Sequence, residues 1–201
     1  MKKAIIFTAG RTGSRLIKAN LTAVLKIEAV SMHNPMFPVG ESDICIVSKR
    51  KNGFIAALSM VVASKINKFH FYPSDNVILD TIPFIVNATD ISNHCFFQKA
   101  FYKLIEKRNI PNPIEIFYED MVADRFYLFN KLNLNYPMKD FLQKSPYNVL
   151  ELVPNWEELE NLFNTEMLVE ISDLEMENFE NSVAMDLDDI KINYNGNRFN
   201  G

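Results

Sequence analysis

Apolar and polar positions along residues 1–150 predict strands and helices in alternation. Short apolar runs, each long enough for one buried strand, are followed by longer stretches with apolar residues at helical spacing. The strands are predicted at 4–8, 29–32, 43–48 and 113–118, and the helices at 13–27, 53–66, 92–108 and 121–132. Alternating strands and helices indicate a parallel sheet between helices, with ligands at the carboxyl ends of the strands. We therefore expect a three-layer α/β domain.

The last part of the chain has a different pattern. Residues 151–201 carry 2 basic and 13 acidic side chains, whereas residues 1–150 carry 19 and 12. A short acidic amphipathic helix is predicted at 156–163, and residues 166–189 mix acidic and apolar positions without a glycine. Three alternatives are open for that stretch: it docks on the α/β domain, it pairs with a second subunit, or it is mobile. We predict an α/β domain over 1–150 and an acidic helical extension over 151–201, in the same domain or as an appendage.

The turn after the first strand has the chemistry of an anion-binding loop. Residues 8–15 are Thr-Ala-Gly-Arg-Thr-Gly-Ser-Arg, and a predicted helix follows. Such a turn aims backbone N–H groups at one point, and the helix N-terminus adds partial positive charge. Two arginines and two hydroxyls add to this. A phosphate, or a group of that shape, is the expected ligand of Gly10, Arg11, Thr12, Gly13, Ser14 and Arg15.

This turn is not a Walker A loop. That loop requires a second Gly followed by Lys, but Arg15 stands at the position of the second Gly, and Ser14 follows Gly13. The lysine that bridges the β- and γ-phosphates is missing, which disfavours a kinase or an ATPase. A plain strand–turn–helix corner without a ligand stays open as the alternative.

Two later strands end in charged residues at the same predicted edge. Strand 43–48 leads into Lys49, Arg50 and Lys51. Cations at a strand end beside a helix N-terminus suit a dianion, although charge runs are usually solvated. Strand 113–118 leads into Glu119 and Asp120.

These three segments, in this order, resemble the sulfotransferase family. Residues 10–14 resemble its 5′-phosphosulfate loop, with Gly10 where the family commonly has Pro. Lys51 and Ser59 have the spacing of its 3′-phosphate site, with Lys in place of Arg, and Lys49 and Arg50 add charge there. Residues 118–121 resemble its Tyr-Glu-Asp-Leu segment, in which the acids are expected to cap a helix and orient loops.

The resemblance covers residues 3–134 and has several implications. It implies a P-loop NTPase-like parallel sheet of the sulfotransferase type, with 3′-phosphoadenosine 5′-phosphosulfate (PAPS) as co-substrate. The family's usual C-terminal Arg-Lys-Gly clamp on the 3′-phosphate is not recognisable in this chain.

Two residues are candidates for the chemistry. Arg11 occupies the loop position of the family's catalytic Lys or Arg, which implies stabilisation of the leaving group. His33 resembles the histidine of the family's Lys-Thr-His-Leu-Pro segment and is suited to accept the acceptor's proton. The alternative is that His33 only ends a strand beside a proline turn, with Glu28 or Glu119 as the substitute base.

We therefore predict a sulfotransferase that moves a sulfuryl group from PAPS to a hydroxyl of a small molecule or carbohydrate. The alternative is a non-catalytic protein that binds 3′-phosphoadenosine 5′-phosphate (PAP) or another nucleotide and retains the fold. The chemistry requires no metal. The loops at 34–42 and 67–90 are expected to select the acceptor.

Composition narrows the setting. The acidic C-terminal part disfavours nucleic acid as a partner. No apolar run reaches the roughly 18 residues of a membrane span. Two cysteines, Cys45 and Cys95, do not make a disulfide scaffold, so a reducing cytoplasm is the expected location. A homodimer stays open.

Overall fold

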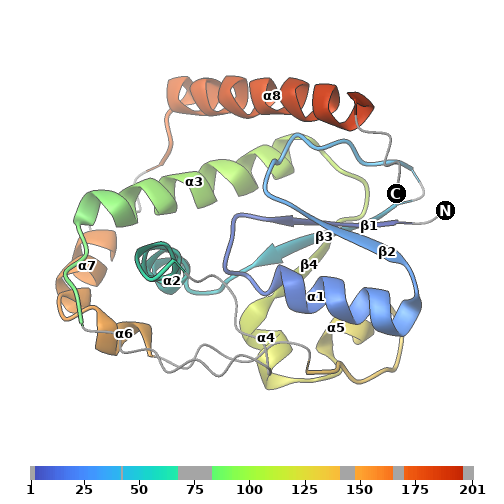
Figure 1. Cartoon of the computed structure of the whole chain (residues 1–201), viewed down its shortest axis with the longest axis horizontal. Coiled ribbons are helices and arrows are strands. Elements are labelled where there is room, and N and C mark those ends of the chain that lie inside the picture. Colours follow the sequence, from blue (N-terminus) through green and yellow to red (C-terminus); the bar gives the residue numbers. More distant parts are fainter. Residues whose placement is uncertain (1–2, 42, 68–82, 141–147, 165–169, 197–201) are drawn as a thin grey trace.

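The computed structural model describes residues 3–41, 43–67, 83–140, 148–164 and 170–196. Four parallel strands form one sheet in the order β2-β1-β3-β4 (Figure 1). Helices flank this sheet, which confirms the α/β class. The strands are β1 (Lys3–Thr8), β2 (Glu28–Met32), β3 (Ile44–Lys49) and β4 (Ile114–Phe117).

β1 is a central strand and is buried on both faces. Ile5 is in register with Val30 of β2 and with Cys45 of β3. Residues 4–8 are all buried, as in parallel strands that helices cover on both sides. Because every pair is parallel, the carboxyl ends of the strands meet at one edge, where Thr8 is in register with Ser48.

One face of the sheet packs against helices that follow β1 and β4. These are α1 (Ser14–Asn20), the π-helical turn η1 (Leu21–Leu25), α4 (Tyr118–Ala123) and α5 (Tyr127–Asn130). Its core includes Ile6, Ile17, Leu21, Ile116 and Phe129, all fully buried.

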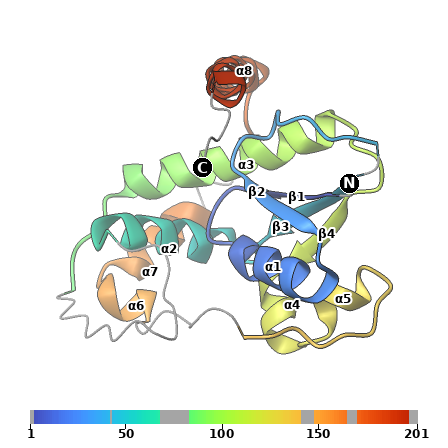
Figure 2. The same cartoon turned by 45° about the vertical axis from the view of Figure 1, so that its right-hand side comes forward.

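The other face packs against α3 (Ala88–Lys107) and the chain after β2. Phe7 and Val47 of the sheet contact Phe101 and Leu104 of α3 in one cluster. The link from β2 to β3 lies on this face, whereas α1 lies on the opposite face (Figures 1 and 2). The chain therefore changes face between β1 and β3, and in open α/β sheets ligands bind at such a switch point.

A third cluster lies beyond the carboxyl edge of the sheet (Figure 1). It joins α2 (Gly53–Lys65), the first part of α3, α6 (Val149–Leu152) and α7 (Trp156–Leu162). Phe54 and Leu58 of α2 pack there with Leu152 and Leu159.

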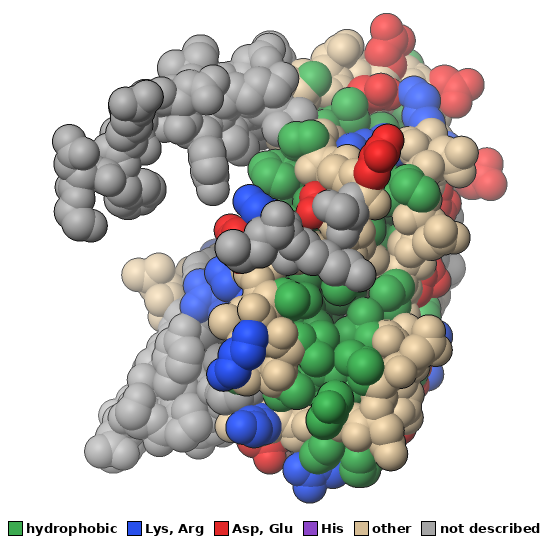
Figure 3. Space-filling model, turned by 90° about the vertical axis from the view of Figure 1, so that its right-hand side faces the viewer, with side chains coloured by type: hydrophobic (Ala, Val, Ile, Leu, Met, Phe, Trp, Pro, Cys, Tyr) green, Lys and Arg blue, Asp and Glu red, His purple; other side chains and the backbone are tan. Residues whose placement is uncertain are grey.

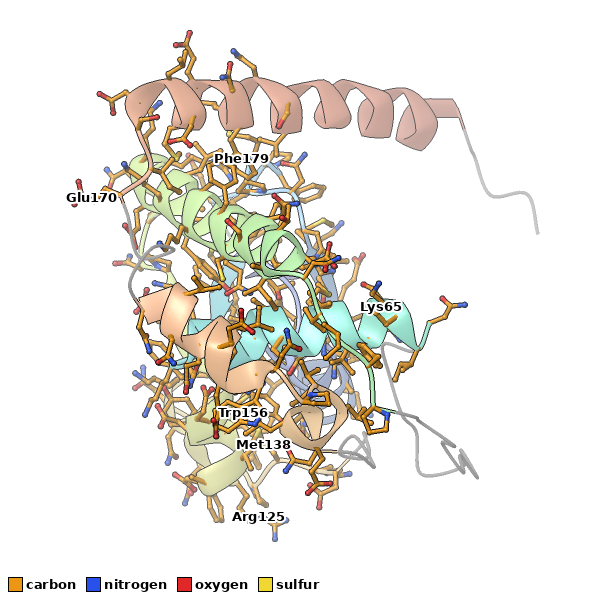
Figure 4. All side chains as sticks on the ribbon, turned by 90° about the vertical axis from the view of Figure 1, so that its left-hand side faces the viewer. Lys65, Arg125, Met138, Trp156, Glu170 and Phe179 are labelled. Atoms are coloured by element: carbon orange, nitrogen blue, oxygen red, sulfur yellow. The ribbon has the colours of Figure 1, made fainter. Side chains whose placement is uncertain are left out.

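The acidic C-terminal segment docks on α3. The helix α8 (Asp173–Gly196) places Met176, Phe179 and Val183 in the same core as α3. Figure 4 shows Phe179 pointing from α8 toward α3, where its ring meets Phe97 with centroids 5.8 Å apart. Of the three alternatives for this segment, docking on the body is the one observed for the first part of α8.

Three predicted helices differ from the structure in their extent. The helix predicted at 13–27 ends at Leu25, because Lys26 takes a left-handed conformation with φ 56°. The helix predicted at 92–108 begins four residues earlier, at Ala88. Residues 121–132 do not form one helix, because Asp124 is extended and its carboxylate accepts a hydrogen bond of 2.8 Å from the Phe126 N–H.

Candidate functional site

Hydroxyl groups fix the conformation of the loop after β1. The hydroxyls of Thr8 and Thr12, both buried, are 2.7 Å apart, and the Gly10 N–H donates to Thr8 Oγ1 at 3.1 Å. From β3, Ser48 Oγ donates to the Thr12 carbonyl oxygen at 2.8 Å. The hydroxyl of the predicted ligand residue Thr12 therefore helps to fix the conformation of the loop.

The two loop glycines both have positive φ angles and lie close to neighbouring side chains. Gly10 has φ +99°, and a Cβ there would lie 2.2 Å from Cε of Met60 on α2. Gly13 has φ +79°, and its Cβ would lie 2.7 Å from the ring of Tyr118 on α4. Positive φ and close approach both favour glycine. The loop is thus held between α2 and α4.

Tyr102 of α3 joins the ends of β1 and β3. Its hydroxyl donates to the Ser48 carbonyl oxygen at 2.7 Å and accepts a hydrogen bond from the Ala9 N–H. Burial raises the pKa of this hydroxyl. This role of Tyr102 is not predictable from the sequence, because an aromatic residue on an apolar helix face indicates only core packing.

Arg50 brings the three predicted segments together. Its Nε donates to Glu119 Oε1 at 2.8 Å, and its Nη1 donates to the Arg11 carbonyl oxygen at 3.2 Å. The guanidinium carbon lies 4.4 Å from the centroid of the Tyr118 ring. One side chain therefore connects the loop, the end of β3 and the first turn of α4.

Glu119 anchors the chain after β3. Its second carboxylate oxygen accepts the Lys51 N–H at 3.0 Å. Burial raises the pKa of this carboxyl group, but the hydrogen bonds from backbone N–H groups and from Arg50 outweigh burial and hold it below its usual value. A carboxylate with a lowered pKa is a poor proton acceptor, which favours the orienting role over that of substitute base.

Each of the three cations at the carboxyl end of β3 has a carboxylate partner. Lys49 pairs with Glu115 and, at 3.8 Å, with Glu106. Arg50 pairs with Glu119 as described above, and Lys51 Nζ lies 2.5 Å from Asp120 Oδ1. The side chains of Lys49 and Arg50 are 18% and 15% exposed, whereas that of Lys51 is 55% exposed. These three cations and their carboxylate partners thus form a set of ion pairs, in which Lys51 is the cation most exposed to solvent.

Ser59, Ser14 and Arg15 lie on the two helices that begin beside the site. Ser14 and Arg15 open α1, where Ser14 is partly buried and Arg15 is exposed. Ser59 lies within α2 and is only 7% exposed, so it and Lys51 differ sharply in access to solvent.

His33 is exposed and is the first residue after β2. β1 separates β2 from β3 in the sheet, which places His33 and Lys51 at the same edge but on opposite sides of the loop after β1. The adjacent Asn34 donates from Nδ2 to the Val183 carbonyl oxygen of α8 at 2.8 Å.

The prediction of Glu28 as a substitute base was wrong. It begins β2 and pairs with Lys3 at 3.5 Å, at the amino edge of the sheet. Figure 3 faces this side of the molecule, where hydrophobic side chains gather. Glu28 lies at the amino end of β2, so the whole length of the strand separates it from the carboxyl edge of the sheet. It therefore cannot reach a site at that edge.

The first predicted acceptor loop is held against the core. Met36 and Phe37 pack against the cluster under α3, and Arg108 donates to the carbonyl oxygens of Pro35 and, at 3.0 Å, of Phe37. Most of the second predicted acceptor loop, residues 68–82, lies outside the described residues.

The described residues were also compared with the requirements of metal, thiol and membrane sites. Within the described ranges, no group of three or more His, Cys, Asp or Glu side chains is placed to hold a metal ion. Cys45 and Cys95 are buried free thiols, and burial raises the pKa of each to about 11. None of the helices in the described part of the chain has the length and apolar character to cross a membrane.

Comparison with known proteins adds no relative: neither a family model, nor a curated protein, nor a solved structure matches this chain. The evidence for the function of the site is therefore the arrangement of its own residues.

Proposed function

We propose that this protein is a sulfotransferase that binds PAPS at the carboxyl edge of its sheet and transfers the sulfuryl group to a hydroxyl acceptor. The observation that carries the proposal is the set of contacts made by Arg50. They connect Arg11, Glu119 and the Tyr118 ring, so the three segments that resemble sulfotransferase motifs meet at one place. A P-loop NTPase-like fold of the sulfotransferase type is part of the same proposal.

The two anionic groups of the co-substrate bind at two separate positions of the site. The 5′-phosphosulfate lies against the loop at 10–15, where N–H groups and the start of α1 stabilise negative charge. The 3′-phosphate lies by Lys51, at the start of α2. Lys49 and Arg50 hold the chain beside it through their ion pairs with Glu115 and Glu119.

The reaction exchanges one bond to sulfur for another. The acceptor oxygen forms a bond to sulfur while the bond from sulfur to the bridging phosphate oxygen breaks, and PAP leaves with that electron pair. Arg11 stabilises the charge that develops on the bridging oxygen. His33 accepts the proton of the acceptor hydroxyl. The position of His33 across the loop from Lys51 leaves the nucleotide and the acceptor on different sides of the sulfur.

A non-catalytic PAP-binding protein is the second candidate. It is favoured by the ion-pair network, because Lys49, Arg50 and Lys51 are already neutralised by carboxylates. Such a site has less positive charge to spare for a phosphosulfate in its transition state.

Turnover of PAPS separates the two candidates. The assay measures formation of PAP in the presence of a panel of phenols, alcohols and sugars. We expect acceptor-dependent turnover that Arg11→Ala abolishes, with only partial loss of PAP binding. Lys18→Ala, an exposed cation in the last turn of α1, is the matched control and is expected to keep wild-type turnover. Turnover that Arg11→Ala leaves unchanged overturns the assignment.

A further inference from the structure

Lys51 and Asp120 form the ion pair of the site that is best placed to exchange partners. The side chains of the two residues are 55% and 30% exposed. Exposed ion pairs contribute little net free energy, because water competes for both groups. An incoming phosphate can therefore take the place of the carboxylate at low cost.

The other two cations are held more firmly. Arg50 is bound to Glu119 and to the Arg11 carbonyl oxygen and stacks on Tyr118. Turning it toward a ligand would release the loop that it supports. Lys49 is 18% exposed and lies between Glu106 and Glu115.

Asp120 is fixed, whereas the Lys51 side chain is long and flexible. Asp120 belongs to the first turn of α4, and its carboxylate also accepts a hydrogen bond from the Tyr127 hydroxyl. The backbone of Lys51 is held by Glu119, so only its side chain is able to move between partners. The carboxylate therefore stays beside the position that a phosphate on Lys51 would take.

We infer that Asp120 is a specificity-determining residue that competes with the ligand's 3′-phosphate for Lys51. The inference rests on the proposed function, since it assigns the 3′-phosphate to Lys51. A nucleotide with a 3′-phosphate must displace Asp120 and then gains the contact to Lys51. A nucleotide without one leaves the pair intact. Asp120 thus lowers the affinity for PAPS and for PAP alike, because both carry the 3′-phosphate, and it speeds the release of the product PAP.

Calorimetric titration of PAP and AMP into four proteins and one control variant tests this. They are the wild type, Asp120→Asn, Lys51→Met and the double variant. Asn keeps an oxygen for Tyr127 and removes only the charge. Glu28→Gln, which loses a paired carboxylate at the opposite edge of the sheet, is the matched control.

We expect Asp120→Asn to lower the Kd for PAP by about three- to tenfold, as for the release of an exposed ion pair, and to leave AMP within twofold. The gain disappears in the double variant and shrinks at high salt, because exposed charges are screened. Lys51→Met alone brings the affinity for PAP down to that for AMP, and Glu28→Gln changes neither.

Other outcomes overturn the inference in distinguishable ways. If the wild type prefers PAP over AMP but Asp120→Asn does not bind PAP more tightly, the inference is wrong and the proposed function stands. Equal tightening of AMP means a general charge effect and also overturns it. If the wild type does not bind PAP, the proposed function fails with it. Should Asp120→Asn not fold, Lys51→Met decides, since wild-type affinity for PAP in that variant refutes the inference.

Discussion

The hydroxyl of Tyr102 lies 2.7 Å from the carbonyl oxygen of Ser48, at the point where β1 and β3 separate. Ser48 in turn donates to the Thr12 carbonyl oxygen of the loop. A side chain of α3 thereby sets the position of the loop through two successive hydrogen bonds. The shape of the proposed phosphosulfate site depends on a residue outside its three motifs.

Removal of this hydroxyl is expected to weaken both stability and binding. Tyr102→Phe leaves the Ser48 carbonyl and the Ala9 N–H without this partner, which costs about 1–3 kcal/mol of unfolding free energy. Urea unfolding measures the loss. Tyr136→Phe, at a side chain that is half exposed, is the control and is expected to change stability by less than about 0.5 kcal/mol. Equal stability of the two variants would mean that the Tyr102 hydrogen bonds are not formed in solution.

A side chain at Gly10 is expected to destabilise the protein. Gly10→Ala forces a Cβ against Met60 and strains a backbone with φ +99°, at a cost of about 1–3 kcal/mol. Met60→Ala in the same chain removes the contact but not the strain, so thermal unfolding should show partial rescue. Gly53→Ala is the matched control, because its Cβ would have ordinary contacts of 3.7 Å or more at the start of α2. Alanine there is expected to stabilise the protein by about 0.5–1 kcal/mol.

Glu119 is expected to make stability depend on pH in the acid range. Its folded pKa lies below its ordinary value of 4.5, so the carboxylate stabilises the fold above that pH. This contribution is lost as the pH falls through the lowered folded value. Glu119→Gln should therefore be less stable than the wild type at pH 7, by about 1–2 kcal/mol after allowance for partial exposure.

The measurement is urea unfolding from pH 7 to pH 3. The gap between Glu119→Gln and the wild type is expected to close toward the acid end. Glu28→Gln should follow the wild type throughout, since its pair with Lys3 is exposed. A gap of constant size would show that Glu119 acts through packing and not through its charge.

His33 is expected to act in chemistry and not in nucleotide binding. His33→Ala should lower kcat about 100-fold or more, as for loss of a general base, with the Kd for PAP within twofold of the wild type. Loss of PAP binding would instead mean that His33 has a structural role at the end of β2.

Local signals predicted much of the fold. The strand predicted at 4–8 agrees with β1 within one residue. A short, continuous apolar run is typical of a strand that helices cover on both faces of a parallel sheet. The helix at 53–66 agrees with α2 equally well. The helix at 121–132 was wrong because a side-chain hydrogen bond of Asp124 offers its backbone an alternative to the helix.

The ion-pair network was beyond local signals. Arg50 and its partner Glu119 are 69 residues apart in the chain, and Tyr102 is 54 residues from Ser48. A run of three cations indicates positive charge, but the carboxylates that neutralise it come from α3, β4 and α4. Only the order of the strands in the sheet brings these groups together.

Calorimetric titration of the wild-type protein with PAP, with AMP and with ATP plus magnesium tests the central claim most directly. We expect PAP to bind more tightly than AMP, because the loop after β1 and Lys51 each hold one phosphate. Equal affinity for PAP and AMP, or a preference for ATP with magnesium, would contradict it.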